Sequence, residues 1–464
     1  MMPEELDRER RHRCDFALLV VLAGLARLMP IMWFTPIYSE FSQFFFPFAA
    51  LSEAGAYPFV DYWLEYPPVF PWLSVAVYKF AALLAGGLSG TAVTPVEVGT
   101  VHNLYVVTMQ VLMATFETAN IVLIYAVVRE RWDRRMACRA SWIFALLFYP
   151  TLVTVSYFDG FVLFWLLLSI WLFLRRRPLG SAAILAVGVM AKIIPVVFLP
   201  VALKYLPTWR RRLAYLGVFF IVILAIEAPF LLSSPRKVAT SYRAMARRKP
   251  WETVWALFEG YYGCGVVGPG AGDISDGARR RWEALAGPKV SRLAVVLGAV
   301  HIPQRRELCR QRTLSRFDDR VDFIERAKQE TFYLLMAVPF LFVLGYAFWR
   351  GRADWSPENI LVFALAATCL FMIYSKGWSP QFLIYPLALC LFGLGRYEGP
   401  VFIIALSLVN YVEMPLWLVW PRLAGGGGHV LLEFAVAVRT VLLLCILYIC
   451  LRRLCPRRSP APSA

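Results

Sequence analysis

Long apolar runs recur from one end of this 464-residue chain to the other. Hydrophobic residues make up 59% of the sequence, and its mean hydropathy is +0.59. A soluble domain is about 45–50% apolar, and about 20 consecutive apolar residues are needed for a helix to cross a bilayer. The sequence therefore predicts an all-α polytopic membrane protein. It excludes a soluble multidomain protein, because the one long polar stretch is residues 233–330.

The net charge of +17 does not indicate a nucleic-acid partner. The arginines cluster at the ends of apolar runs, where basic residues orient helices and meet anionic lipid headgroups. Nine cysteines are scattered without paired spacing, and His102, His301 and His429 lack the spacing of metal ligands. No cofactor is predicted, and a dependence on a divalent metal is left open.

Basic residues assign an orientation to the apolar runs, because Lys and Arg are enriched on the cytoplasmic side. We expect a cytoplasmic N-terminus (1–14), an N-terminal transmembrane module (15–232), a long external loop (233–330), a C-terminal transmembrane module (331–451) and a disordered cytoplasmic tail (452–464). About twelve spans are expected, with both ends cytoplasmic. They are 15–34, 101–128, 139–156, 160–174, 179–191, 193–207, 213–232, 331–349, 357–374, 381–395, 400–420 and 429–451.

Residues 67–86 are apolar enough to cross the membrane but are not expected to do so. A crossing there would place residues 87–100, which contain no Lys or Arg, in the cytoplasm and the arginines of 129–139 outside. Both placements contradict the positive-inside rule. Three prolines also interrupt the start of the run. We therefore expect residues 35–100 to form one external loop with two interfacial helices.

Unusual polar residues fall on the external side of this topology. Ionisable residues at membrane depth are costly and are functional candidates by default. The candidates are Glu40, Asp61, Glu65, Asp159, Lys192, Arg247, Lys376 and Gln381.

One carboxylate among several cations suits sugar transfer from a lipid phosphate. The carboxylate removes the proton of an acceptor hydroxyl, and the cations stabilise the departing phosphate. We take Glu40 as the candidate base and the other seven residues as substrate-binding. Structural roles are the alternatives: Asp159 as a helix N-cap, Lys192 at lipid headgroups, and Asp61 with Glu65 as a loop-organising pair.

The external loop carries motifs that resemble those of the GT-C superfamily of membrane glycosyltransferases. Glu40 stands where the family has its catalytic Asp, ahead of a turn like G-x-x-P-Y, here Gly55-Ala56-Tyr57-Pro58. Further matches along the chain are Glu65-Tyr66-Pro67-Pro68, Glu117 and Asn120, Tyr149-Pro150, Phe158-Asp159, Lys192 to Pro195, and Ser375 to Phe382. Their order matches the family from about residue 15 to 450.

Within that superfamily, the sequence resembles polyprenol-phosphate-mannose-dependent α-mannosyltransferases, such as the actinobacterial mannolipid enzymes and the catalytic subunit of the first GPI mannosyltransferase. The resemblance implies a GT-C-like fold and an inverting hexosyltransferase, with a polyprenyl-phosphate sugar donor and a lipid-linked or surface glycan acceptor. The charge pattern predicts an extracytoplasmic site. We expect a prokaryotic cell membrane, because no retention signal is visible, with the endoplasmic reticulum as the alternative. This chain departs from the family in having Glu40 for Asp and in lacking the Asp-x-Asp pair of the GPI enzyme.

Two other classes of protein are alternatives. A transporter or lipid-linked-sugar flippase also needs charges in the membrane and broken helices, but it predicts matching interrupted helices in two halves of the chain. A non-catalytic subunit of a glycosyltransferase would lack an acid facing the external cavity.

Overall fold

The computed structural model describes residues 3–33, 39–85, 95–246, 250–259, 323–417 and 428–455, with the single residues 277 and 280. Within these ranges the chain is helical and has no β-strand, only two isolated bridges, Pro58 with Tyr62 and Trp251 with Gly377. An all-α fold was predicted from the apolar runs, and the described residues confirm it.

The chain begins with a long helix that is followed by several short ones. The first elements are α1 (Pro3–Trp33), the π-helix η1 (Phe41–Phe45), α2 (Phe46–Ala50), the 3₁₀ helix η2 (Leu51–Ala54) and α3 (Val69–Leu84). The next are α4 (Pro95–Arg131), α5 (Arg134–Leu146), α6 (Phe148–Ser156), α7 (Asp159–Leu174), α8 (Pro178–Ala191), η3 (Ile194–Val197), α9 (Phe198–Tyr205) and α10 (Trp209–Ser233).

The second half contains further long helices joined by tight connections. They are α11 (Pro235–Ala246), α12 (Val254–Glu259), α16 (Phe323–Arg350), α17 (Pro357–Tyr374), the 3₁₀ helix η6 (Pro380–Leu383), α18 (Ile384–Gly393), α19 (Glu398–Tyr411), the π-helix η7 (Val412–Trp417) and α20 (Gly428–Leu454). Helix α20 therefore extends to Leu454, past residue 452 where the disordered tail was expected to begin.

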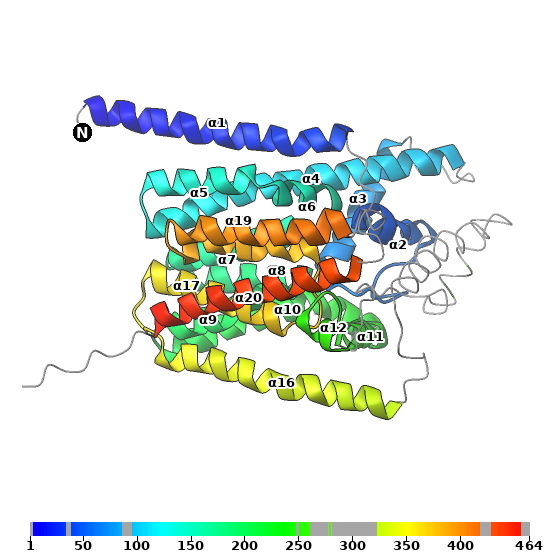
Figure 1. Cartoon of the computed structure of the whole chain (residues 1–464). Helices are drawn as coiled ribbons and strands as arrows, with labels where there is room; N and C mark the ends of the chain where they lie inside the picture. Colours follow the sequence, from blue (N-terminus) through cyan, green and yellow to red (C-terminus); the bar gives the residue numbers. More distant parts are fainter. Residues whose placement is uncertain are drawn as a thin grey trace, which may run out of the picture.

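The long helices lie side by side in one bundle, with α1 and α16 on opposite outer faces (Figure 1). At one end of the bundle lie α2, α3, α11 and α12, and we call this the loop end (Figure 1). The opposite end carries Arg131, Arg396 and Arg453, and we call it the arginine end. Helix α17 connects the two, because it starts beside Arg131 through Glu358 and leads into the loop that begins at Ser375.

Four described helical segments are long and apolar enough to cross a membrane: Thr100–Arg131, Trp209–Ser233, Pro357–Tyr374 and Val430–Leu454. The pair α5 and α6, bent by 55°, is a fifth if the two helices form one span. Where the expected spans lie within the described residues, they fall on helices or on consecutive helical segments. The number that cross the bilayer, and the interfacial position of α3, stay predictions.

Proline places polar residues at the ends of the shorter helices. Helix α8 ends at Lys192, whose backbone is extended, and Pro195 lies in the first turn of η3. Pro380 likewise opens η6, next to Gln381. Proline has no N–H to continue a helix but fits its first turn. The breaks therefore place Lys192 at the C-cap of α8 and Gln381 in the short 3₁₀ helix η6, outside the long helices.

An aromatic cluster attaches the first loop to the bundle. Phe70 of α3 stacks on Phe158 with ring centroids 3.9 Å apart, and Phe45 of η1 meets both rings edge-on at 4.8 and 5.5 Å. The hydroxyl of Tyr62 donates to the carbonyl of Phe48 at 2.8 Å. Buried aromatic rings contribute large apolar areas together with specific edge-to-face geometry, so the loop is fixed against the start of α7.

A second segment docks at the loop end through backbone hydrogen bonds. Trp251 N donates to the carbonyl of Lys376 at 3.0 Å, and Trp378 N donates to the carbonyl of Trp251 at 3.1 Å. Trp255 Nε1 donates to the carbonyl of Ile373 at 3.0 Å. The Trp251 ring lies against Gly377, where an added Cβ would overlap the ring.

We predict that Gly377→Ala destabilises the protein by about 1–3 kcal/mol, because the new methyl group displaces the Trp251 ring. Thermal unfolding of the detergent-solubilised protein, with tryptophan fluorescence as the probe, measures the effect. The control is Gly217→Ala in α10, where an added Cβ meets no atom within 4 Å and helix propensity rises. Equal unfolding temperatures for the two variants would contradict this docking.

Candidate functional site

Glu40 is buried at the loop end, directly before η1, with 2% of its surface exposed. Tyr66 OH donates to Glu40 Oε1 at 3.4 Å. Burial raises the pKa of Tyr66 well above its usual value, and the charges of Glu40 and Asp159 raise it further. Tyr66 therefore stays protonated and serves as a hydrogen-bond donor to the carboxylate.

Asp159 and Lys192 form a buried ion pair beside Glu40. Asp159 lies in the first turn of α7, and its Oδ1 accepts from Lys192 Nζ and from Tyr385 OH, both at 2.8 Å. The Asp159 side chain is fully buried and that of Lys192 is 8% exposed. The second oxygen, Asp159 Oδ2, has no hydrogen-bond partner among the described residues. One acceptor position therefore remains beside a buried cation.

Aromatic rings surround the Lys192 ammonium group. Its Nζ lies 4.4 Å from the ring centroid of Phe382, 4.8 Å from that of Phe158 and 5.6 Å from that of Tyr66. A cation within about 6 Å of a ring face is attracted by the ring quadrupole. Tyr66 thus contacts Glu40 through its hydroxyl and Lys192 through its ring. The acid and the cation are two sides of one site.

Tyr157 connects this site to a third acidic residue. It lies at the end of α6, and burial raises its pKa well above the usual value. The negative charges of Glu40, Glu252 and Asp159 raise that pKa further. Burial and these charges therefore keep Tyr157 protonated.

A buried arginine organises the other side of the loop end. Arg439 of α20 pairs with Glu413 of η7, and its second nitrogen donates to the carbonyl of Glu252. Its guanidinium lies 4.1 Å from the ring centroid of Trp378. Arg439 is 3% exposed and Glu413 is fully buried. Arg439 therefore joins α20, η7 and the loops around Glu252 and Trp378.

The remaining predicted residues have different environments. Asp61 organises its own loop, because its Oδ2 accepts from Tyr57 N at 3.0 Å. Glu65 is 1% exposed, in the loop before α3. Lys376 Nζ donates to the carbonyl of Ala246 at 3.2 Å, at the end of α11. Gln381 is 4% exposed, and its Oε1 has no partner among the described residues.

Arg247 lies outside the described residues, so its substrate-binding role stays a prediction. The described contacts bring Glu40, Asp159 and Lys192 together. Asp61 instead accepts from the backbone of its own loop, and Lys376 donates to the backbone of the last residue of α11. No group of three His, Cys, Asp or Glu side chains that could hold a metal ion occurs in the described part of the chain.

Sequence reasoning assigned no site role to the tyrosines that complete the site. Tyr66 and Tyr385 bond Glu40 and Asp159, but each precedes a proline in an aromatic-rich stretch that fits a membrane-interface belt equally well. Arg439 carries a recognisable signal, a lone arginine within an apolar run. Its partner Glu413 was not singled out, because pairing across helices cannot be read from one sequence.

No protein-family model and no curated protein matches this sequence. Among solved structures, the apo oligosaccharyltransferase of Archaeoglobus fulgidus is similar, with 14% identity and a TM-score of 0.40 over 94% of this chain and 55% of that one. The oligosaccharyltransferase AglB of the same organism, bound to an inhibitory peptide and a dolichol-phosphate, gives 13% identity, 96% and 56% coverage and a TM-score of 0.40. This chain spans about half of their length. At this TM-score we transfer neither fold nor activity from them.

We predict that Asp159→Asn destabilises the protein by about 3–5 kcal/mol, because it leaves the Lys192 charge buried without its carboxylate. The measurement is thermal unfolding in detergent. Glu130→Gln is the matched control, since it breaks an ion pair in which Glu130 is 25% exposed and Arg175 is 58% exposed. It should lower the stability by under about 1 kcal/mol. Adding Lys192→Met to Asp159→Asn should restore part of the loss. Equal losses for the Asp159 and Glu130 variants would contradict a buried pair.

Proposed function

We propose that the protein is a membrane glycosyltransferase of the GT-C type that transfers a sugar from a polyprenyl-phosphate donor with inversion. The observation that carries this proposal is the contact of Tyr66 with both a buried acid, Glu40, and a buried cation, Lys192. Sugar transfer from a lipid phosphate needs a base and a phosphate-binding cation on opposite sides of one sugar.

In the proposed reaction, an acceptor hydroxyl attacks the anomeric carbon and Glu40 takes its proton. A base contributes about 10²–10⁴-fold when it lies within hydrogen-bond reach of that proton. The Tyr66 hydroxyl bonds one oxygen of Glu40 and orients it.

The bond from the anomeric carbon to the phosphate oxygen breaks as the new glycosidic bond forms. Its electron pair goes to the departing polyprenyl phosphate. Lys192 Nζ is placed to stabilise that growing charge, since a fixed cation in a water-poor site acts strongly on a developing anion. Asp159, which also accepts from Tyr385 OH, holds the ammonium group in position. Gln381 and Arg439 are further candidates for donor contacts.

The proposed donor is a polyprenyl-phosphate monosaccharide, most simply mannose, and the proposed acceptor is a lipid-linked or surface glycan. The proposed site lies on the extracytoplasmic face, which the positive-inside charge distribution supports, and the proposed membrane is a prokaryotic cell membrane. The placement of Glu40, Asp159 and Lys192 in one cluster at one end of the bundle favours an enzyme over a transporter. A transporter is expected to bind near the midplane between two related halves.

We predict that Glu40→Gln lowers transfer from radiolabelled polyprenyl-phosphate mannose by at least about 100-fold, because the amide cannot accept the proton. Glu40→Asp keeps the carboxylate and should retain more activity than Glu40→Gln. Thin-layer separation of labelled products from purified enzyme and a membrane-lipid acceptor extract measures the rate.

Glu53→Gln is the control, since Glu53 is an acid of the same loop that lies in η2, outside the cluster. It should leave transfer within about threefold of wild type. Parallel assays with polyprenyl-phosphate glucose test the sugar. Undiminished transfer by Glu40→Gln would refute the assigned base.

A further inference from the structure

We propose that the arginine end holds a binding site for an anionic phospholipid. Its phosphate would lie among Arg131, Arg396 and Arg453, and one acyl chain would lie in the groove between α19 and α20. This site is at the opposite end of the bundle from Glu40 and Lys192, and the proposal is independent of the proposed function.

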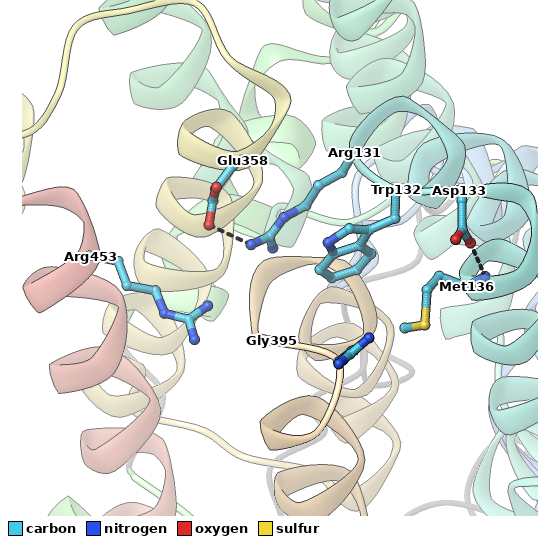
Figure 2. A pocket seen from close by; sticks show the side chains of 8 residues that line it. Arg131, Trp132, Asp133, Met136, Glu358, Gly395 and Arg453 are labelled. Atoms are coloured by element: carbon cyan, nitrogen blue, oxygen red, sulfur yellow. Dashed lines mark hydrogen bonds and ion pairs between the residues drawn. The ribbon is translucent and has the colours of Figure 1, made fainter.

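The headgroup part is a cavity of about 400 Å³ at the arginine end. Its lining residues are Arg131, Trp132, Asp133, Met136, Glu358, Gly395, Arg396 and Arg453. Figure 2 shows Arg131 and Arg453, from α4 and α20, reaching into the space beside Gly395. A Cβ added to Gly395 would lie 3.3 Å from Arg453 Nη2. The absence of a side chain at Gly395 therefore keeps this cavity open next to the arginine.

Arg131 is a buried and preorganised part of this cavity. Its side chain is 7% exposed, with the guanidinium 4.2 Å from the Trp132 ring centroid and Nη2 donating to Glu358 at 2.6 Å. Its Nε is buried and has no hydrogen-bond partner among the described residues. A buried donor without a partner costs free energy, and an incoming phosphate oxygen would relieve that cost.

Each acid around the cavity already has a partner among the described residues. Asp133 Oδ1 caps α5 by accepting from Met136 N at 2.8 Å, and Glu358 pairs with Arg131 (Figure 2). Glu398 pairs with Arg453. Arg396 has no carboxylate within ion-pair distance among the described residues and is exposed. It is the cation most available to an anion.

The chain part is an apolar groove of about 500 Å³ between α19 and α20. It is lined by Phe402, Val441, Leu444, Cys445, Tyr448 and Ile449. From Val441 to Ile449 it follows α20 for about 12 Å at 1.5 Å per residue. Its length and apolar lining suit part of an acyl chain.

The groove and the cavity adjoin along two helices. On α20, Arg453 is four residues after Ile449, and on α19, Glu398 is four residues before Phe402. Residues four apart lie on the same face of a helix, and Arg453 bonds Glu398 across this seam. The basic cavity therefore caps the apolar groove. Basic pockets between transmembrane helices are sites for anionic lipid headgroups, and a free phosphate would leave the groove without an occupant.

The test is a lipid titration of the purified full-length protein in detergent, read by native mass spectrometry. Phosphatidylglycerol and phosphatidylcholine with identical chains are compared with soluble glycerol phosphate. Combining Arg396→Gln with Arg453→Gln should weaken the binding of phosphatidylglycerol about thirtyfold and leave the binding of phosphatidylcholine unchanged. The matched control combines Arg210→Gln with Arg211→Gln, two exposed arginines at the start of α10, and should bind as wild type.

Cys445→Trp fills the groove without changing any arginine, and it should also weaken the binding of phosphatidylglycerol. This variant still tests the lipid site if the double arginine variant fails to fold. Equal binding of the two lipids by wild type would overturn the proposal, as would wild-type binding by both test variants. Binding of glycerol phosphate as strongly as phosphatidylglycerol would assign the cavity to a soluble phosphate instead of a lipid.

Discussion

The ion pair of Asp159 and Lys192 is the interaction on which the loop end depends. Two opposite charges removed from water are costly unless hydrogen bonds complete the pair. Here Tyr385 bonds Asp159, while the rings of Phe158, Phe382 and Tyr66 cover the ammonium group. The pair joins the start of α7 to the end of α8, and its aromatic surroundings join both to the first loop. Glu40 reaches this centre only because that loop is fixed there.

The helical class and the polar end of the bundle were predictable from sequence. The lengths of the apolar runs predict helices. The distribution of Lys and Arg predicts that Glu40, Asp159 and Lys192 lie at one end of the bundle. The positions of the prolines also indicated the breaks beside Lys192 and Gln381.

Side-chain pairing was not predictable, because it depends on distances between helices. Tyr66 and Tyr385 look like interface aromatics in the sequence, yet they bond the two acids. Lys376 had the same sequence signals as Lys192, but its ammonium group bonds a backbone carbonyl of α11. The number of membrane crossings also cannot be read from helix length alone, since several helices at the breaks are shorter than a full span.

The central claim is that a lipid phosphate binds at Lys192 with its sugar-bearing side toward Glu40, and a structure with that ligand tests it most directly. The measurement is electron cryo-microscopy of the protein in nanodiscs with polyprenyl phosphate. Phosphate density within hydrogen-bond reach of Lys192, on the side facing Glu40, is the predicted result. Density for the polyprenyl phosphate elsewhere, with Lys192 still closed onto Asp159 and the aromatic rings, would contradict the account.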